Sequence, residues 1–161
     1  MKRIDSVAEN MSRGLIYLHP KNKLVTAFRL MNDHKIKHIP VIEKDRIVGI
    51  VSDRDILLHL KLETNGADEK LDIPDLYIED ICSAELITCT PFHGVSEAAE
   101  LMLFHEIDSL PVVGKGNKLL GIITSSDLLK YIANEDDNYS NQKIEDILRK
   151  IPINHDFAAY C

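Results

Sequence analysis

The chain has 161 residues, of which 45% are hydrophobic and 28% are charged, and its formal net charge is −7. This composition is typical of a globular protein with one domain, or with two small domains that share a core. The negative charge tells against nucleic acid as the main partner, because binding to a polyanion depends on many Lys and Arg contacts. No apolar run approaches the roughly 20 residues that a membrane span needs. The first residues also lack the apolar core of a signal peptide, so we expect a cytoplasmic protein with no membrane partner.

The first 60 residues predict the element order β-α-β-β-α. Residues 4–20 indicate a short helical lead-in, a turn, and a strand at Leu15–Leu18 that stops before Pro20. Residues 23–32 predict a helix, because apolar residues recur on one face at Leu24, Ala27, Phe28 and Met31. Two short β-branched runs, HIPVI and IVGIV, then predict a strand pair, and Ser52 begins a helix that ends near Leu60.

The second half of the chain repeats this order. Residues 61–77 are rich in polar and turn residues, and we expect a linker there, with room for a short helical piece. Residues 78–133 predict a lead-in, a strand in LITCTP, a helix at Val95–Glu106, a strand pair and a final helix. Residues 134–161 predict an acidic hinge and a helical tail. The predicted boundaries are therefore 1–60 for a first unit with its lead-in, 61–77, 78–133 for a second unit, and 134–161.

One stretch of the chain occurs twice. IPVIEKDRIVGIVSDRDIL at Ile39–Leu57 has its counterpart in LPVVGKGNKLLGIITSSDLL at Leu110–Leu129, with one extra residue in the second turn. A repeat of this length is too long for a solenoid. It predicts two copies of one supersecondary unit that pack against each other.

These motifs resemble a tandem pair of cystathionine β-synthase (CBS) domains, the arrangement called a Bateman module. The resemblance rests on the lead-ins SVAENMSRGLIYLHP and IEDICSAELITCTP, on the two proline-valine strands, and on G-h-h-[ST]-x-x-D at Gly49–Asp55 and Gly121–Asp127. It covers residues 4–132. It implies an α/β fold of the mixed α+β type, in which two β-α-β-β-α units pack pseudo-symmetrically through their sheets. Modules of this family commonly form disc-like homodimers.

Each copy places a hydroxyl and a carboxylate three residues apart where a strand meets a helix. The pairs are Ser52 with Asp55 and Thr124 with Asp127. The carboxylates can accept hydrogen bonds from the hydroxyls of a ribose, while a phosphate lies near the unpaired N–H groups of the helix start. The same spacing makes an ordinary capping box. The residues alone leave both interpretations open, and the family resemblance favours ribose contact.

The resemblance also implies an apolar slot for an adenine base, between the first strand and the proline-containing strand. The slot residues would be Ile16, Ile39 and Pro40 in one unit and Ile87, Leu110 and Pro111 in the other. Each of these is equally well explained as part of a hydrophobic core.

Candidate phosphate ligands are confined to the first unit. They are Lys37, His38 and Arg54, and the alternative for this cluster is a solvated helix end. The second unit has acidic or hydroxyl residues in the equivalent stretch. Basic groups of the first unit can bind the phosphate of a ligand whose ribose is held by either unit. We therefore expect one good nucleotide site and one that is poor or empty.

Other motifs give weaker predictions. Residues 114–118 (GKGNK) lie between two predicted strands, so a hairpin turn is a better interpretation than a phosphate loop. His34 and His38 have i, i+4 spacing, but a strand should already have begun before Pro40, and we expect no metal site. No disulfide or zinc spacing joins the three cysteines, Cys82, Cys89 and Cys161.

Two functional hypotheses follow. The first is a non-catalytic regulatory module that binds AMP, ADP, ATP (with or without magnesium) or S-adenosylmethionine between paired CBS units and transmits occupancy to a regulated protein partner. The alternative is a ligand-free CBS dimerisation scaffold. The chain has no G-x-S-x-G or H-E-x-x-H motif, and we expect no catalytic site.

Overall fold

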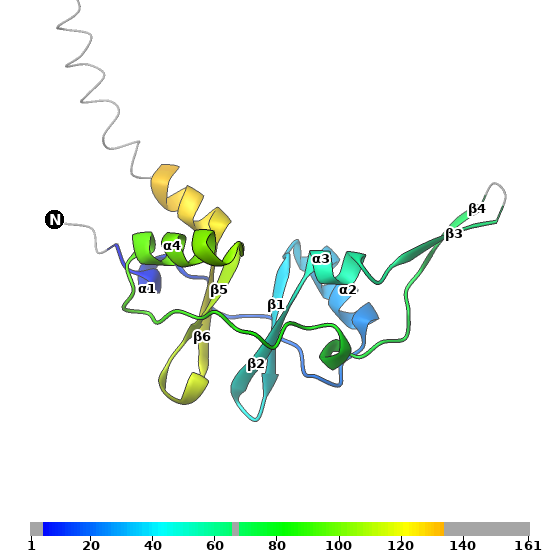
Figure 1. The fold of residues 1–161 in the computed structure, drawn as a ribbon, viewed down its shortest axis with the longest axis horizontal. Coiled ribbons are helices and arrows are strands. Elements are labelled where there is room, and N and C mark those ends of the chain that lie inside the picture. Colours follow the sequence, from blue (N-terminus) through cyan, green and yellow to red (C-terminus); the bar gives the residue numbers. More distant parts are fainter. Residues whose placement is uncertain (1–4, 66–67, 134–161) are drawn as a thin grey trace, which may run out of the picture.

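The computed structural model describes residues 5–65 and 68–133, which form two similar units (Figure 1). The first contains α2 (Leu24–His34), β1 (His38–Glu43), β2 (Arg46–Ser52) and α3 (Asp53–Leu57). The second contains α4 (Val95–His105), β5 (Ser109–Val113) and β6 (Leu119–Thr124), and residues 125–133 are helical. This confirms the predicted mixture of helices and strands in two units.

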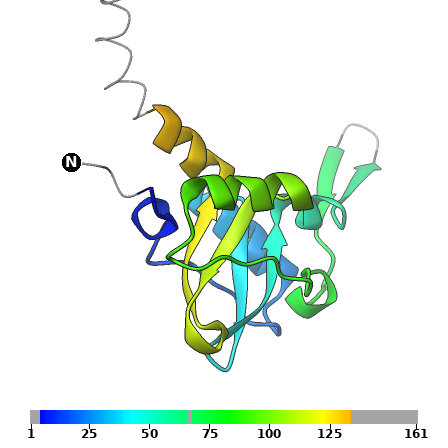
Figure 2. The ribbon, with the colours of Figure 1, turned by 60° about the vertical axis from the view of Figure 1, so that its left-hand side comes forward.

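Each unit has its own hydrophobic core. The apolar face predicted for α2 is buried at Leu24, Ala27 and Met31, with Phe28 packed at the edge of the core. The second core is built from α4, β5 and β6 in the same way. The strand pairs of the two units lie side by side (Figures 1 and 2), and Ile47, Val113 and Ile122 are buried without belonging to either core. Such residues fit a position between the two sheets.

The strand pairs are antiparallel hairpins, as predicted. β1 and β2 are joined at Lys44 and Asp45, which both have positive φ, the geometry of a tight hairpin turn. Between β5 and β6 the GKGNK segment makes a short 3₁₀ turn at Lys115–Asn117, with positive φ at Gly116. Residues 114–118 are therefore a hairpin turn and not a phosphate loop.

The strands predicted before each main helix are wrong as extended strands. Leu18 forms a single parallel bridge with Val41: its N–H donates to the Pro40 carbonyl at 2.9 Å, and it accepts from the Ile42 N–H at 2.7 Å. The next rungs of a parallel ladder would need N–H donors at positions 40 and 20, and both residues are prolines.

The second unit has the same interruption. Cys89 makes the equivalent single bridge with Val112. Pro91 and Pro111 take the places where the next N–H donors would be needed. Paired prolines therefore limit the third strand of each sheet to one residue.

The lead-ins are exchanged between the units, which the sequence did not indicate. Helix α1 (Val7–Asn10) packs on the second unit, where Val7 is fully buried and its N–H donates to the His93 carbonyl at 2.8 Å. The 3₁₀ helix η1 (Ile78–Asp80) packs on the first unit, where Ile78 is fully buried. The first turn of each unit therefore packs on the other unit. The boundaries 1–60 and 78–133 stay predictions.

Glycines in the middle of β2 and β6 accommodate the exchanged lead-ins. A Cβ atom on Gly121 would lie 2.5 Å from Met11 Sδ and 2.9 Å from the Ser12 carbonyl oxygen. A Cβ atom on Gly49 would lie 2.9 Å from Cys82 Sγ and 3.1 Å from the Ser83 carbonyl oxygen. The absence of a side chain therefore lets each lead-in cross its sheet at close range.

The segment between the units is a β-hairpin. β3 (Lys61–Asn65) pairs with β4 (Asp68–Asp72) in an antiparallel sheet of its own, which projects away from both units (Figure 1). The short helical piece expected within residues 61–77 is therefore wrong, since the described part of this segment is a hairpin followed by an irregular stretch. The hinge and tail predicted at 134–161 lie outside the described residues.

Candidate functional site

The two hydroxyl–carboxylate pairs form reciprocal capping boxes. In the first unit the N–H and Oγ of Ser52 each donate to Asp55 Oδ2 at 2.7 Å, and the Asp55 N–H donates back to Oγ at 3.2 Å. In the second, the N–H and Oγ1 of Thr124 donate to Asp127 Oδ2 at 2.9 and 2.8 Å, and the Asp127 N–H donates back at 3.3 Å. The capping interpretation is therefore correct for both pairs.

Capping leaves one oxygen of each carboxylate for other contacts. In both pairs it is Oδ2 that accepts the capping hydrogen bonds. Asp127 Oδ1 lies 3.7 Å from Lys130 Nζ on the exposed side of the next turn. A carboxylate has lone pairs for about four hydrogen bonds, so a cap does not exclude a ribose contact by the same residue.

A cleft of about 780 Å³ lies between the two units. Its walls come from the crossing segment 12–16, from the stretch before β1, and from the start of helix 125–133. The predicted site residues that line it are Ile16, Lys37, His38, Pro40, Arg54, Thr124 and Asp127. The cleft thus brings together the predicted ribose pair of the second unit with apolar and basic residues of the first.

Comparison with known proteins decides the family. The family model "CBS domain" matches residues 4–62 and again residues 78–134, which together are most of the chain. The chain belongs to the CBS domain family. CBS domain-containing protein YhcV of Bacillus subtilis is 30% identical over 125 residues, which are 78% of this chain and 84% of that protein.

Two further CBS relatives define the fold and the extent of the match. MJ1225 of Methanocaldococcus jannaschii is 29% identical over 143 residues, and the chain spans only 50% of its length. The CBS domain pair of MJ0100, solved with 5′-methylthioadenosine and S-adenosylmethionine, has a TM-score of 0.69 and 24% identity, over 82% of this chain and 98% of that one. At this identity the likeness shows the fold: the two units are a CBS domain pair.

The other predicted site residues lie outside this cleft of the CBS pair. Ile39 and Leu110 are wholly buried in the two cores, and Pro111 is buried in β5. Ile87 packs against the second core. Ser52 and Asp55 form the cap of α3 without lining the cleft. The core interpretation therefore describes Ile39 and Leu110 best, and their contact with a ligand stays a prediction.

The cleft is basic although the whole chain is acidic. Its cationic side chains are Arg13, Lys35, Lys37, Arg54 and Lys130, and its carboxylates are Asp53, Asp108 and Asp127. Sequence reasoning missed Arg13 and Lys130. Lys130 could have been found, because it follows Asp127 by three residues on one helix face. Arg13 could not, because it reaches the cleft only through the exchange of the lead-ins.

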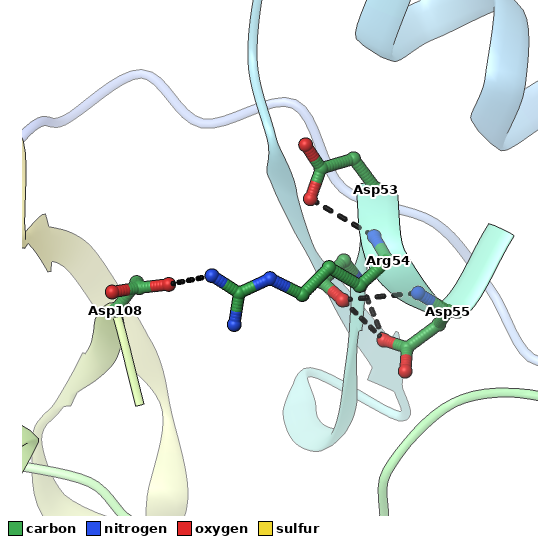
Figure 3. Close-up of polar contacts among 5 residues, drawn as sticks. Asp53, Arg54, Asp55 and Asp108 are labelled. Carbon is green, nitrogen blue, oxygen red and sulfur yellow. Dashed lines mark hydrogen bonds and ion pairs between the residues drawn. The ribbon is translucent and has the colours of Figure 1, made fainter. Parts of the chain in front are cut away.

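An ion pair joins the two CBS units beside the cleft. Arg54 Nη2 donates to Asp108 Oδ2 at 2.9 Å, from the first turn of α3 to the residue before β5 (Figure 3). The side chains are 75% and 45% exposed, so the pair is well hydrated. On the other side of the same turn Asp55 points into its capping box (Figure 3).

His38 lies in the cleft wall with a perturbed pKa. Burial lowers the pKa of its imidazole below the usual value, and the nearby Asp53 and Asp108 only partly oppose this effect.

Within residues 5–65 and 68–133, no three His, Cys, Asp or Glu side chains are grouped as metal ligands. No helix in this part of the chain is long and apolar enough to cross a membrane.

Proposed function

We propose that the cleft binds an adenosine-type ligand, one of AMP, ADP, ATP or S-adenosylmethionine, and that the module passes on its occupancy to a regulated protein. One observation carries this proposal: a ribose-type pair (Thr124 and Asp127), apolar residues (Ile16 and Pro40) and cations meet in one cleft of about 780 Å³. A cavity of this size suits a nucleotide. The complex of the MJ0100 CBS pair with adenosyl ligands supports it.

Each wall of the cleft suits one part of such a ligand. The Oδ1 atom of Asp127 accepts no capping hydrogen bond and lies 3.7 Å from the exposed Lys130 Nζ, so it is an acceptor for ribose hydroxyls, and the Asp127 side chain is only 13% exposed. Ile16 offers an apolar surface to the base, and Pro40 lines the cleft with a side chain that is almost fully buried. Lys37 and Arg54 offer cationic donors to a phosphate. Magnesium would be needed only as the counter-ion of a polyphosphate, and we propose no catalytic role for the chain.

The pseudo-equivalent site is a poor one in this proposal. Its capping pair is Ser52 and Asp55. By the repeat, Glu106 and Asp108 occupy the positions that Lys35 and Lys37 hold in the first unit. The matching backbone supports this equivalence, since Lys35 and Glu106 both end a helix with φ of 55°. Carboxylates at these positions oppose a phosphate, so we propose one occupied site per chain.

Ligand binding would act on the relative arrangement of the units. The cleft takes its walls from both units and from the segment that crosses between them. A ligand can shift such an arrangement only by its different affinity for the two states. We propose a homodimer as the assembly that carries the response, on the family resemblance alone. The second candidate function, a ligand-free dimerisation scaffold, is favoured by the intact capping boxes, which explain both motifs without a ligand.

A thermal-shift experiment with a matched pair of variants tests the proposal. Ligand at 100 times its Kd adds about 2.7 kcal/mol, which raises the Tm of a chain of this size by about 5 to 10 °C. The ligands are AMP, ADP, ATP with and without magnesium, and S-adenosylmethionine. Asp55→Ala and Asp127→Ala each remove one capping box of equal geometry, so each should cost about 1 kcal/mol of stability.

The two variants differ in the predicted ligand contact, and Asp127→Ala also removes an exposed ion pair with Lys130, which contributes little to stability. Asp127 lines the cleft and Asp55 does not. Asp127→Ala should therefore abolish the ligand-induced shift, whereas Asp55→Ala should keep it. No shift with any ligand at millimolar concentration would leave the scaffold function in place. A shift that survives in Asp127→Ala would refute the ribose contact.

A further inference from the structure

The carboxylate of Asp108 has no place in the proposed binding of a phosphate, although it lines the same cleft. Asp127 is the ribose acceptor of the proposal, and Asp53 accepts from the Arg54 N–H at 2.9 Å at the start of α3. Asp108 instead holds the Arg54 guanidinium, which is the planar donor best suited to a phosphate. The cation is thus paired within the chain itself.

The ion pair is exposed enough for Arg54 to leave Asp108 and bind another anion. With side chains 75% and 45% exposed, it is of the kind that contributes little to stability, because water competes for both charges. A phosphate offers more acceptor oxygens and more charge than one carboxylate, so it can take Arg54 from Asp108. Asp108 then stands without its partner, close to the negative charge of the ligand.

We infer that Asp108 is a specificity-determining residue, which lowers the affinity of the cleft for anionic adenosyl ligands and leaves the affinity for uncharged ones unchanged. The inference rests on the proposed function of the cleft. The repeat shows why this residue is distinctive: the equivalent position in the first unit is Lys37, a cation of the same cleft. One half of the pseudo-symmetric pair therefore attracts phosphate and the other half opposes it.

The charge of the ligand separates this role from a general effect on the cleft. AMP and adenosine share the base and the ribose and differ in the phosphate. Asp108→Asn keeps the size of the side chain and removes its charge. Its main-chain carbonyl, which accepts from the Ser125 N–H at 2.9 Å, is unaffected by the substitution. We expect the Kd for AMP to fall about fivefold, the factor at the upper end of what one exposed ion pair contributes, and the Kd for adenosine to stay within about twofold.

Titration calorimetry on the full chain measures both constants. Asp33→Asn, an exposed carboxylate on α2 outside the cleft, changes the net charge by the same amount and is the matched control. Arg54→Gln should weaken the binding of AMP and leave the Kd for adenosine unchanged. Circular dichroism melts verify that every variant is folded.

Each outcome bears on the inference or on the function beneath it. An unchanged or larger Kd for AMP in Asp108→Asn overturns the inference, and so does an equal gain for adenosine or for the Asp33→Asn control. If S-adenosylmethionine binds the native chain and AMP binds only Asp108→Asn, the inference is supported. If no adenosyl ligand binds the native chain or any variant, the proposed function itself fails, and the inference fails with it.

Discussion

Replacement of Gly121 by Ala should push the exchanged lead-in away from β6. The new methyl group would lie 2.5 Å from Met11 Sδ, which can move aside, and 2.9 Å from the Ser12 carbonyl oxygen, which belongs to the main chain. Overpacking of this kind costs about 1–3 kcal/mol. The lower entropy of the unfolded Ala chain returns about 0.4–1 kcal/mol. At the midpoints of these two ranges we expect a net loss of about 1–2 kcal/mol, or a Tm lower by about 2–8 °C.

The matched variant is Gly49→Ala in the first unit. Its methyl group would lie 2.9 Å from Cys82 Sγ and 3.1 Å from the Ser83 carbonyl oxygen. The main chain therefore has to shift less than in Gly121→Ala, and the loss of stability should be smaller. Urea denaturation followed by circular dichroism measures both. Ser12 lines the cleft and Ser83 does not, so only Gly121→Ala should also weaken ligand binding. The reasoning is refuted if Gly121→Ala is as stable as the native chain, or if Gly49→Ala costs more.

Two further predictions concern the exchanged core and the cleft wall. Ile78→Ala should cost about 2–5 kcal/mol, as for other buried aliphatic truncations, because Ile78 is wholly buried in the first unit. The backbone amides of α2, β1 and β2 should then exchange their hydrogens faster with solvent. If only the amides of α4, β5 and β6 exchange faster, the packing of η1 on the first unit is contradicted. The pKa of His38 is lowered by burial, so below its ordinary value of 6.5 the unfolded chain binds more protons than the folded chain, and the free energy of unfolding must fall as the pH drops from about 7. His38→Gln should flatten this part of the stability curve measured by urea titration at each pH, and an unchanged slope would show that His38 does not contribute.

The features that the sequence predicted correctly are those with a local cause. The apolar face of α2, the hairpin turn at Lys44 and Asp45, and the capping boxes at Ser52 and Thr124 each depend on residues within a few positions of one another. Such patterns specify the same geometry in most folds. The duplication strengthened them, because the same short-range signals occur twice in the same order.

The sequence contains the residues that reduce the strand before each main helix to a single bridge. Four prolines, Pro20, Pro40, Pro91 and Pro111, remove the donors on both sides of each single bridge. Their effect depends on register, however, and register is not visible until the pairing of Leu18 with Val41 is known. The apolar run before each helix therefore resembled a strand although its ladder could not extend.

The cleft depends on contacts that no local pattern encodes. The predicted ribose pair comes from the second unit, while Pro40 and Arg54 come from the first. Arg13 arrives through a lead-in that packs on the other unit. The sequence supplied the residue types and the repeat, but the choice of Asp127 over Asp55 for this cleft follows only from how the units pack.

The exchange of lead-ins also limits how a ligand in the cleft can act. Ser12 and Ile122 exchange two main-chain hydrogen bonds of 2.8 and 3.1 Å, and Ser83 and Ile50 exchange two of 3.0 and 3.2 Å. Separation of the units would break these four bonds, each worth about 0.5–1.5 kcal/mol, and would expose Val7 and Ile78 from their cores. Exposed side chains such as Arg54 can change partner at far lower cost. If the proposed function holds, occupancy should therefore change the relative arrangement of the units by small shifts that start at the rim of the cleft near Arg54 and Asp108, without separating the units.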